Sequence, residues 1–134
     1  MKIDGACYCG QIQYRAEVDP AEVEICRCTD CQTLSGSAFR IVVPAKAGSF
    51  ELLSGTLRTF IKTAESGNRR IQAFCGECGT SVYSTDAEGG PGVIGLRVGT
   101  IRQRNQLPPQ KQYWTRSAHR WAMDLDRLDK VEKQ

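Results

Sequence analysis

Seven cysteines fall into three groups in this chain of 134 residues, and their spacing could bind metal. Cys75 and Cys78 form a C-x-x-C pair with Gly76 and Gly79 beside them. The glycines allow a tight turn, and backbone N–H groups there can donate to the two thiolates. A redox C-x-x-C normally opens a helix after a strand, whereas strand-like sequence flanks this pair on both sides. The pair therefore predicts half of a metal site.

A second pair, Cys7 and Cys9, has the spacing that places both side chains on one face of an extended strand. Together with Cys75 and Cys78 it completes a set of four thiolates. Such a site closes a long loop, so its binding energy also becomes folding energy. Zinc suits this ligand set and needs no redox partner; an iron site of the rubredoxin type is the alternative.

Three cysteines remain, at Cys26, Cys28 and Cys31. A structural zinc site has four protein ligands, whereas a catalytic one keeps three and an open position that a water or a thiolate can take. The odd number of cysteines also argues against a disulfide framework. The alternative is a closed site with a fourth ligand from elsewhere in the chain: Asp30, Asp86 or His119.

Short apolar segments separated by Gly, Pro and Ser must position these thiols. We expect strands at 10–16, 38–44, 49–55, 56–62, 69–74, 80–85 and 93–100. Gly55 suggests a hairpin between the third and fourth of these segments. A short helix should begin at Thr29 or Asp30 as its N-cap. The sequence thus predicts a mainly β fold of antiparallel sheets with few short helices, as a single domain over residues 1–134.

The net charge of +3 is too small and scattered to argue for a nucleic-acid partner. No apolar run is long enough to span a bilayer, which argues against a membrane protein. The N-terminus lacks the apolar core of a signal peptide, so we expect a cytoplasmic protein with reduced thiols. The edge strands of a β domain would allow a homodimer.

Four motifs together resemble the glutathione-dependent formaldehyde-activating family, also called the centromere protein V family. They are G5-x-C-x-C-G10, the C-x-C-x-x-C from Cys26 to Cys31, S35-G-S-A-F39 and F74-C-G-E-C-G79. The resemblance covers roughly residues 4 to 122 and implies a β-tent fold with two zinc ions per chain. It places a structural zinc at Cys7, Cys9, Cys75 and Cys78 and a catalytic zinc at Cys26, Cys28 and Cys31.

The activity that the resemblance implies is a carbon–sulfur lyase reaction run in reverse. A glutathione-like thiol and an aldehyde such as formaldehyde would form an S-hydroxymethyl adduct. Two positions depart from the family pattern: Arg27 and Gln112 stand where many members carry His. Arg27, Arg40 and Arg97 are candidate partners for the carboxylates of the thiol, the alternative being ordinary surface arginines.

Three aromatic residues follow in the same part of the chain, Tyr113, Trp114 and Trp121. They are expected to pack in the core rather than to line a pocket. Two other function classes stay open from the residues alone. One is a non-catalytic zinc scaffold that binds a partner or stores zinc. The other is a redox protein in which the three clustered thiols switch by oxidation.

Overall fold

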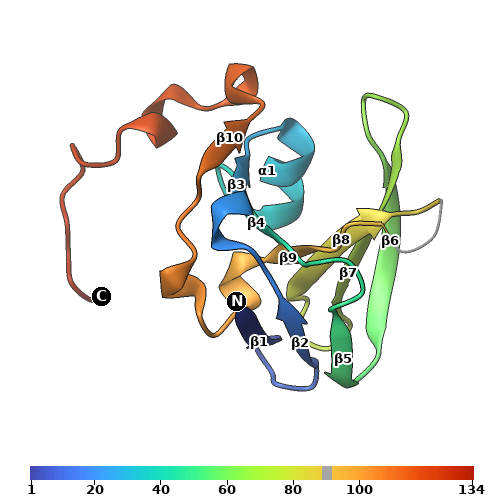
Figure 1. The fold of residues 1–134 in the computed structure, drawn as a ribbon. Coiled ribbons are helices and arrows are strands. Elements are labelled where there is room, and N and C mark those ends of the chain that lie inside the picture. Colours follow the sequence, from blue (N-terminus) through green and yellow to red (C-terminus); the bar gives the residue numbers. More distant parts are fainter. Residues whose placement is uncertain (89–91) are drawn as a thin grey trace.

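The computed structural model describes residues 1–88 and 92–134 and is mainly β, with one α-helix in the described part (Figure 1). The strands are β1 (Lys2–Ala6), β2 (Gln13–Glu17), β3 (Glu24–Cys26), β4 (Arg40–Pro44), β5 (Glu51–Ser54), β6 (Leu57–Thr63), β7 (Arg69–Cys75), β8 (Ser81–Asp86), β9 (Gly95–Arg97) and β10 (Lys111–Tyr113). The helices are α1 (Thr29–Ser35) and the 3-10 turns η1 (Pro20–Glu22), η2 (Val98–Thr100), η3 (Arg104–Gln106), η4 (Thr115–Ser117) and η5 (Arg120–Met123). The expected mainly β fold with few short helices is confirmed.

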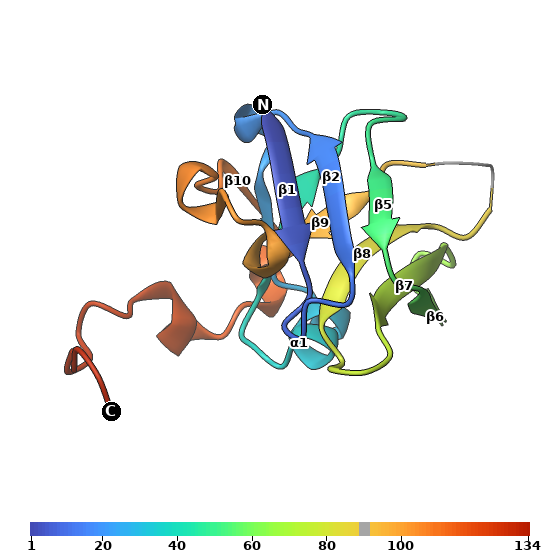
Figure 2. The same cartoon turned by 90° about the horizontal axis from the view of Figure 1, so that it is seen from below.

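The strands form two sheets (Figures 1 and 2). A three-stranded sheet has the order β1-β2-β5, and a seven-stranded sheet has the order β10-β3-β4-β9-β8-β7-β6. Every pairing in the described part is antiparallel except β10 with β3. The larger sheet is therefore mixed, which the sequence did not predict, because a three-residue strand leaves no periodic signal.

The apolar core lies between the two sheets. Tyr14 of β2 is fully buried and its hydroxyl group lies 2.6 Å from Oγ1 of Thr100. Gly5 of β1 is required opposite this ring, because a Cβ there would lie 2.3 Å from Cζ of Tyr14. Val43 and Leu96 face the same core from the larger sheet and are also fully buried. The ring of Phe50 lies between Tyr14 and Tyr83 of β8, so aromatic packing links the two sheets.

The opposite face of the larger sheet carries polar side chains that are nevertheless buried. Because side chains alternate along a strand, Arg97 points away from the core that Leu96 enters. Arg40 of β4 and Gln72 of β7 are buried on the same outer face. Helix α1 packs against β4 over part of this face (Figure 1). Charged side chains are rarely buried unless they have partners, so this polar face is a candidate functional site.

Some local expectations were wrong. The segments on either side of Gly55 do not form a hairpin, because β5 pairs with β2 and β6 pairs with β7 in the other sheet. Gly55 has φ 81° at this crossing, and a Cβ there would lie 2.6 Å from the Gln11 carbonyl oxygen. The N-cap of α1 is Cys28, not Thr29 or Asp30.

The strand expected at 93–100 is shorter, ending at Arg97 and continuing as η2. None of the helices in the described part of the chain is long and apolar enough to cross a bilayer.

Candidate metal centres and the adjoining cavities

The first cluster joins the two sheets. Cys7 and Cys9 follow β1, and Cys75 and Cys78 lie at the turn from β7 to β8. The four sulfur atoms all lie within 4.8 Å of one another, with 3.5 Å between Cys7 and Cys9 and 3.8 Å between Cys9 and Cys75. A tetrahedral zinc site with Zn–S bonds of about 2.3 Å has S–S edges of about 3.8 Å. The cluster therefore fits a four-coordinate metal ion.

Hydrogen-bond donors surround this cluster. The Ile12 amide donates to Sγ of Cys7 at 3.3 Å, and the Thr80 hydroxyl lies 3.1 Å from Sγ of Cys78. The Tyr8 amide donates to the same hydroxyl at 3.1 Å, which orients its proton toward the sulfur. The Thr80 hydroxyl and then its backbone amide lower the pKa of Cys78 to about 5. These groups stabilise the thiolate form that a metal requires.

The second cluster lies where β3 meets α1. Sulfur atoms of Cys26, Cys28 and Cys31 lie within 4.8 Å of one another, and all three residues are partly buried. Cys28 caps the helix, accepting a hydrogen bond from the Cys31 amide at 3.3 Å. No fourth Cys, His, Asp or Glu among the described residues joins the cluster. The donor set fits a metal with three protein ligands and one open position.

The alternative fourth ligands are engaged elsewhere. Asp30 pairs with Lys62, with 2.8 Å between Oδ2 and Nζ, and Asp86 pairs with Arg70. His119 stacks on Trp121 with 5.2 Å between the ring centroids. The closed four-ligand alternative therefore has no support in the described part of the chain.

The sulfur atoms of the second cluster influence the protonation of one another. The neighbouring Cys31 thiol lowers the pKa of Cys26 to about 5 although burial opposes the shift. The same contact raises the pKa of Cys31. The charge of Arg40 favours the thiolate of both residues. A cation in the sheet thus acts directly on two of the three sulfurs.

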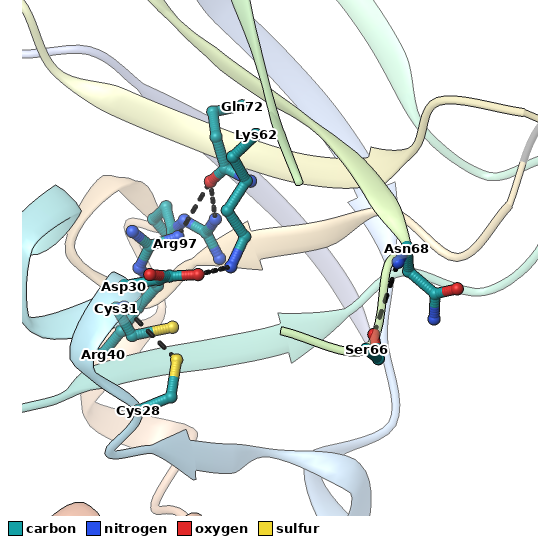
Figure 3. A network of polar contacts seen from close by, with 9 residues as sticks. All are labelled: Cys28, Asp30, Cys31, Arg40, Lys62, Ser66, Asn68, Gln72 and Arg97. Atoms are coloured by element: carbon teal, nitrogen blue, oxygen red, sulfur yellow. Dashed lines mark hydrogen bonds and ion pairs between the residues drawn. The ribbon is translucent and has the colours of Figure 1, made fainter. Parts of the chain in front are cut away.

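Two buried arginines share one acceptor beside this cluster (Figure 3). Nη1 of Arg40 and Nη2 of Arg97 donate to Oε1 of Gln72 at 3.0 and 3.1 Å. Their exposed fractions are 6% and 7%, so they are not surface arginines. Neither pairs with a carboxylate in the described part, and Nη2 of Arg40 and Nε of Arg97 are buried without a partner there. Burial, followed by the charge of Arg40, lowers the pKa of Arg97 to about 9.

Arg27 and Gln112, the two positions that differ from the family pattern, are in contact in the fold. Nε of Arg27, the residue after β3, donates to Oε1 of Gln112 in β10 at 2.8 Å, and β3 and β10 pair in parallel. Arg27 is 5% exposed, and its guanidinium lies 4.8 Å from the ring centroid of Phe39. Its Nη1 is buried with no partner among the described residues. Arg27 and Gln112 therefore form one structural unit next to the cysteines.

Cavities open at both ends of α1. One of about 500 Å³ lies at the helix end and is lined in part by Ser35, Phe39, Arg40 and Arg97. Another of about 400 Å³ lies at the helix start, where Cys28 forms part of the wall. The second cluster is thus reached from the helix start, with the buried arginines behind it.

The aromatic residues at the end of β10 and after it do not pack in the core, contrary to expectation. The exposed fractions of Tyr113, Trp114 and Trp121 are 43%, 42% and 55%, and Trp114 lines the cavity at the start of α1.

The sequence did not predict that Gln72 and Lys62 lie close to the second cluster. Gln72 left a weak signal as a lone polar residue between apolar neighbours in I71-Q-A-F74, whereas Lys62 left none.

Comparison with known proteins assigns the chain to a family. The sequence model of the glutathione-dependent formaldehyde-activating enzyme matches residues 2–117. A search among curated proteins finds no match. The fold resembles a crystal structure of a Rhodobacter sphaeroides protein, with a TM-score of 0.62 and 18% identity, covering 81% of this chain and 98% of that one. At this identity the likeness shows the fold alone.

Proposed function

Because this chain belongs to the glutathione-dependent formaldehyde-activating family, we propose that it joins a glutathione-like thiol to formaldehyde or a similar aldehyde. In the reaction the thiolate sulfur attacks the carbonyl carbon, a C–S bond forms, and the C=O π electrons move to oxygen. That oxygen takes a proton from solvent, giving an S-hydroxymethyl thiol. The thiol releases one proton to solvent when it becomes a thiolate, which balances the proton taken up, and no redox partner is needed because the addition involves no net oxidation or reduction.

The observation that carries this proposal is a three-cysteine cluster beside two buried guanidinium groups that have no carboxylate partner among the described residues. Cys26, Cys28 and Cys31 would hold a zinc ion, which supplies Lewis-acid chemistry and lowers the pKa of a thiol beside it. Cys7, Cys9, Cys75 and Cys78 would hold the second, structural zinc. Two zinc ions per chain follow from these two ligand sets.

The buried arginines explain why the thiol should carry a carboxylate. Burying a cation without a partner is unfavourable, so the pair Arg40 and Arg97 calls for an anion. Three thiolates on Zn²⁺ sum to one negative charge, which leaves the region positive. A ligand carboxylate at Nη2 of Arg40 and Nε of Arg97 would supply the missing acceptors. Arg27 would contribute its free Nη1 in the same way.

Gln72 would fix the geometry of this anion site. Its single Oε1 accepts from both guanidinium groups, so their remaining N–H groups are held in place before the ligand arrives. Preorganised donors lose little entropy when the ligand binds. The burial of both guanidinium groups also strengthens each charged contact.

Zinc content and turnover test the proposal together. Elemental analysis of protein purified without chelator should give two zinc ions per chain. Exchange between glutathione and ¹³C-formaldehyde, followed by NMR, should be faster with enzyme than in buffer. Cys28→Ser should lose one zinc and the rate enhancement. Unchanged turnover together with loss of that zinc would remove the second cluster from the mechanism.

A zinc scaffold for a partner protein is the second candidate, because apolar side chains are exposed on the outer strands. Leu53 of β5 and Phe60 and Ile61 of β6 are 50%, 57% and 44% exposed. β6 is an edge strand and could pair with a second copy of the chain. Normal zinc content without any thiol-dependent consumption of aldehyde would favour this candidate, and sedimentation analysis would show whether a dimer forms.

A further inference from the structure

The cavity at the start of α1 has three walls from distant parts of the sequence. Cys28, Thr29 and Asp30 form the first, and Trp114 forms the second. The end of β6 and the turn after it, residues 62–66, form the third. With about 400 Å³ it can hold part of a small peptide-like molecule. Because Cys28 belongs to the open cluster, a thiol bound there would have its body in this cavity.

Trp114 has a strained backbone conformation at the edge of this cavity. It is the one non-glycine residue of the described chain with positive φ, at φ 57° and ψ 41°. A left-handed conformation costs about 1–2 kcal/mol for a residue with a side chain. The indole is 42% exposed, and the guanidinium of the exposed Arg116 lies 5.0 Å from its ring centroid. Strain held at an exposed aromatic beside a cavity points to a role in binding.

The polar side chains of the cavity are of mixed charge. Lys62 reaches from β6 to Asp30 on α1 (Figure 3), and its side chain is only 18% exposed. An ammonium has three N–H donors and Asp30 takes one, which leaves donors for a second anion. Glu65 adds another carboxylate to the lining. The formal charges of Asp30, Glu65 and Lys62 sum to −1, so the cavity disfavours a purely anionic ligand and suits one that also carries an ammonium group.

We propose that this cavity binds the amino-acid end of the thiol, with its carboxylate on Lys62, its ammonium on Asp30 and Glu65, and its chain against Trp114. The proposal rests on the proposed function and deepens it. The thiol would then be recognised at two ends, by the arginines behind the cluster and by this cavity in front of it. Simple thiols without an α-ammonium and α-carboxylate would bind poorly.

Ligands without a free thiol separate this inference from the proposed function. S-methylglutathione keeps the zwitterionic end but cannot offer a thiolate, and N-acetyl-S-methylglutathione lacks the ammonium charge as well. Titration calorimetry on the zinc-loaded protein should give at least tenfold tighter binding for S-methylglutathione. Equal binding of the two ligands would overturn the inference, even if the enzyme turns over glutathione. Selective binding without any turnover would support the inference and refute the proposed function.

Charge reversal tests the lining without disturbing the fold. Glu65 lies on an exposed turn, and Glu65→Lys changes the lining charge from −1 to +1. We expect this variant to lose most of the preference for the ammonium-bearing ligand. Glu132→Lys makes the same change in net charge on the exposed C-terminal segment and should keep the preference. Loss of preference in both variants, or in neither, would overturn the assignment.

Two further variants address the cation and the indole. Lys62→Met should weaken S-methylglutathione binding at least tenfold, and Lys62→Arg should restore most of it. Restoration would show that the ligand requires a positive charge at this position, which Met lacks. Trp114→Phe should weaken binding, whereas Trp121→Phe, which changes the other exposed tryptophan, should not. Wild-type affinity in Lys62→Met and Trp114→Phe would overturn the inference.

Discussion

The two cysteine clusters should differ in how much they stabilise the fold. The first cluster links Cys9 to Cys75 across 66 positions, whereas the second spans only residues 26–31. The chain-entropy relation for a cross-link gives about 4 kcal/mol for a loop of that length and about 2 kcal/mol for a loop of five residues. We therefore expect Cys9→Ser to lower the free energy of unfolding by about 4 kcal/mol. Cys28→Ser should lower it by at most about 2 kcal/mol.

Cys9 is exposed, so its replacement by Ser should change the metal site without leaving a cavity in the core. Guanidinium unfolding of each variant, at fixed zinc and protein concentration and followed by circular dichroism, measures the difference. Elemental analysis on the same samples shows which zinc has been lost. Equal destabilisation by the two variants, with one zinc lost from each, would refute the argument that loop length separates the structural centre from the open one.

Three other perturbations test the packing and the charges. Arg97→Met should stabilise the ligand-free protein at pH 7 and weaken binding of S-methylglutathione. The fall of the Arg97 pKa to about 9 corresponds to a destabilisation of up to about 5 kcal/mol, present below pH 9 and relieved as pH rises toward 12.5. Denaturant titration would show the opposite sign if an unseen partner satisfied the guanidinium. Gly5→Ala should lower the stability by about 1–3 kcal/mol, since its Cβ would overlap the Tyr14 ring, and an unchanged melting temperature would contradict this. Burial raises the pKa of Tyr14 to about 12, so stability should fall by about 3 kcal/mol between pH 10 and 12 because the unfolded chain loses this proton first. Thermal melts across that range should show the loss in the wild type and less of it in Tyr14→Phe.

The cysteine groups could be predicted from the sequence because their chemistry is local. Two residues separate Cys75 from Cys78, and one separates Cys7 from Cys9, so each pair presents two sulfurs to one point whatever the fold. Counting ligands then suggested which pairs meet, and the structure brings these four sulfurs within 4.8 Å. The mainly β class could be predicted for a similar reason, since alternation within a strand is a property of neighbouring residues.

What could not be predicted depends on contacts between distant segments. The two strands around Gly55 have the pattern of a hairpin, but β5 and β6 belong to different sheets. No residue near Gly55 indicates which sheet each strand joins. Gln72 is an outward-facing strand residue, and only its contacts with Arg40 and Arg97 place it beside the second cluster. The meeting of Arg27 with Gln112 likewise depends on the parallel pairing of β3 and β10, two strands too short to show periodicity.

The positions of the two clusters in the fold account for their difference in ligand number. The first lies at the junction of two sheets, where loops from both sides converge and can supply two sulfurs each. The second lies between one strand end and one short helix, so all of its sulfurs come from a single stretch of chain. Its far side is occupied by cations rather than by ligands, because Arg40 and Arg97 stand on the sheet behind it. The positive charge of these arginines would repel a further metal cation and attract an anion. A thiolate that also bears a carboxylate is such an anion. In the proposed function, the buried arginines would therefore both keep the fourth position free of a protein ligand and select the anion that fills it.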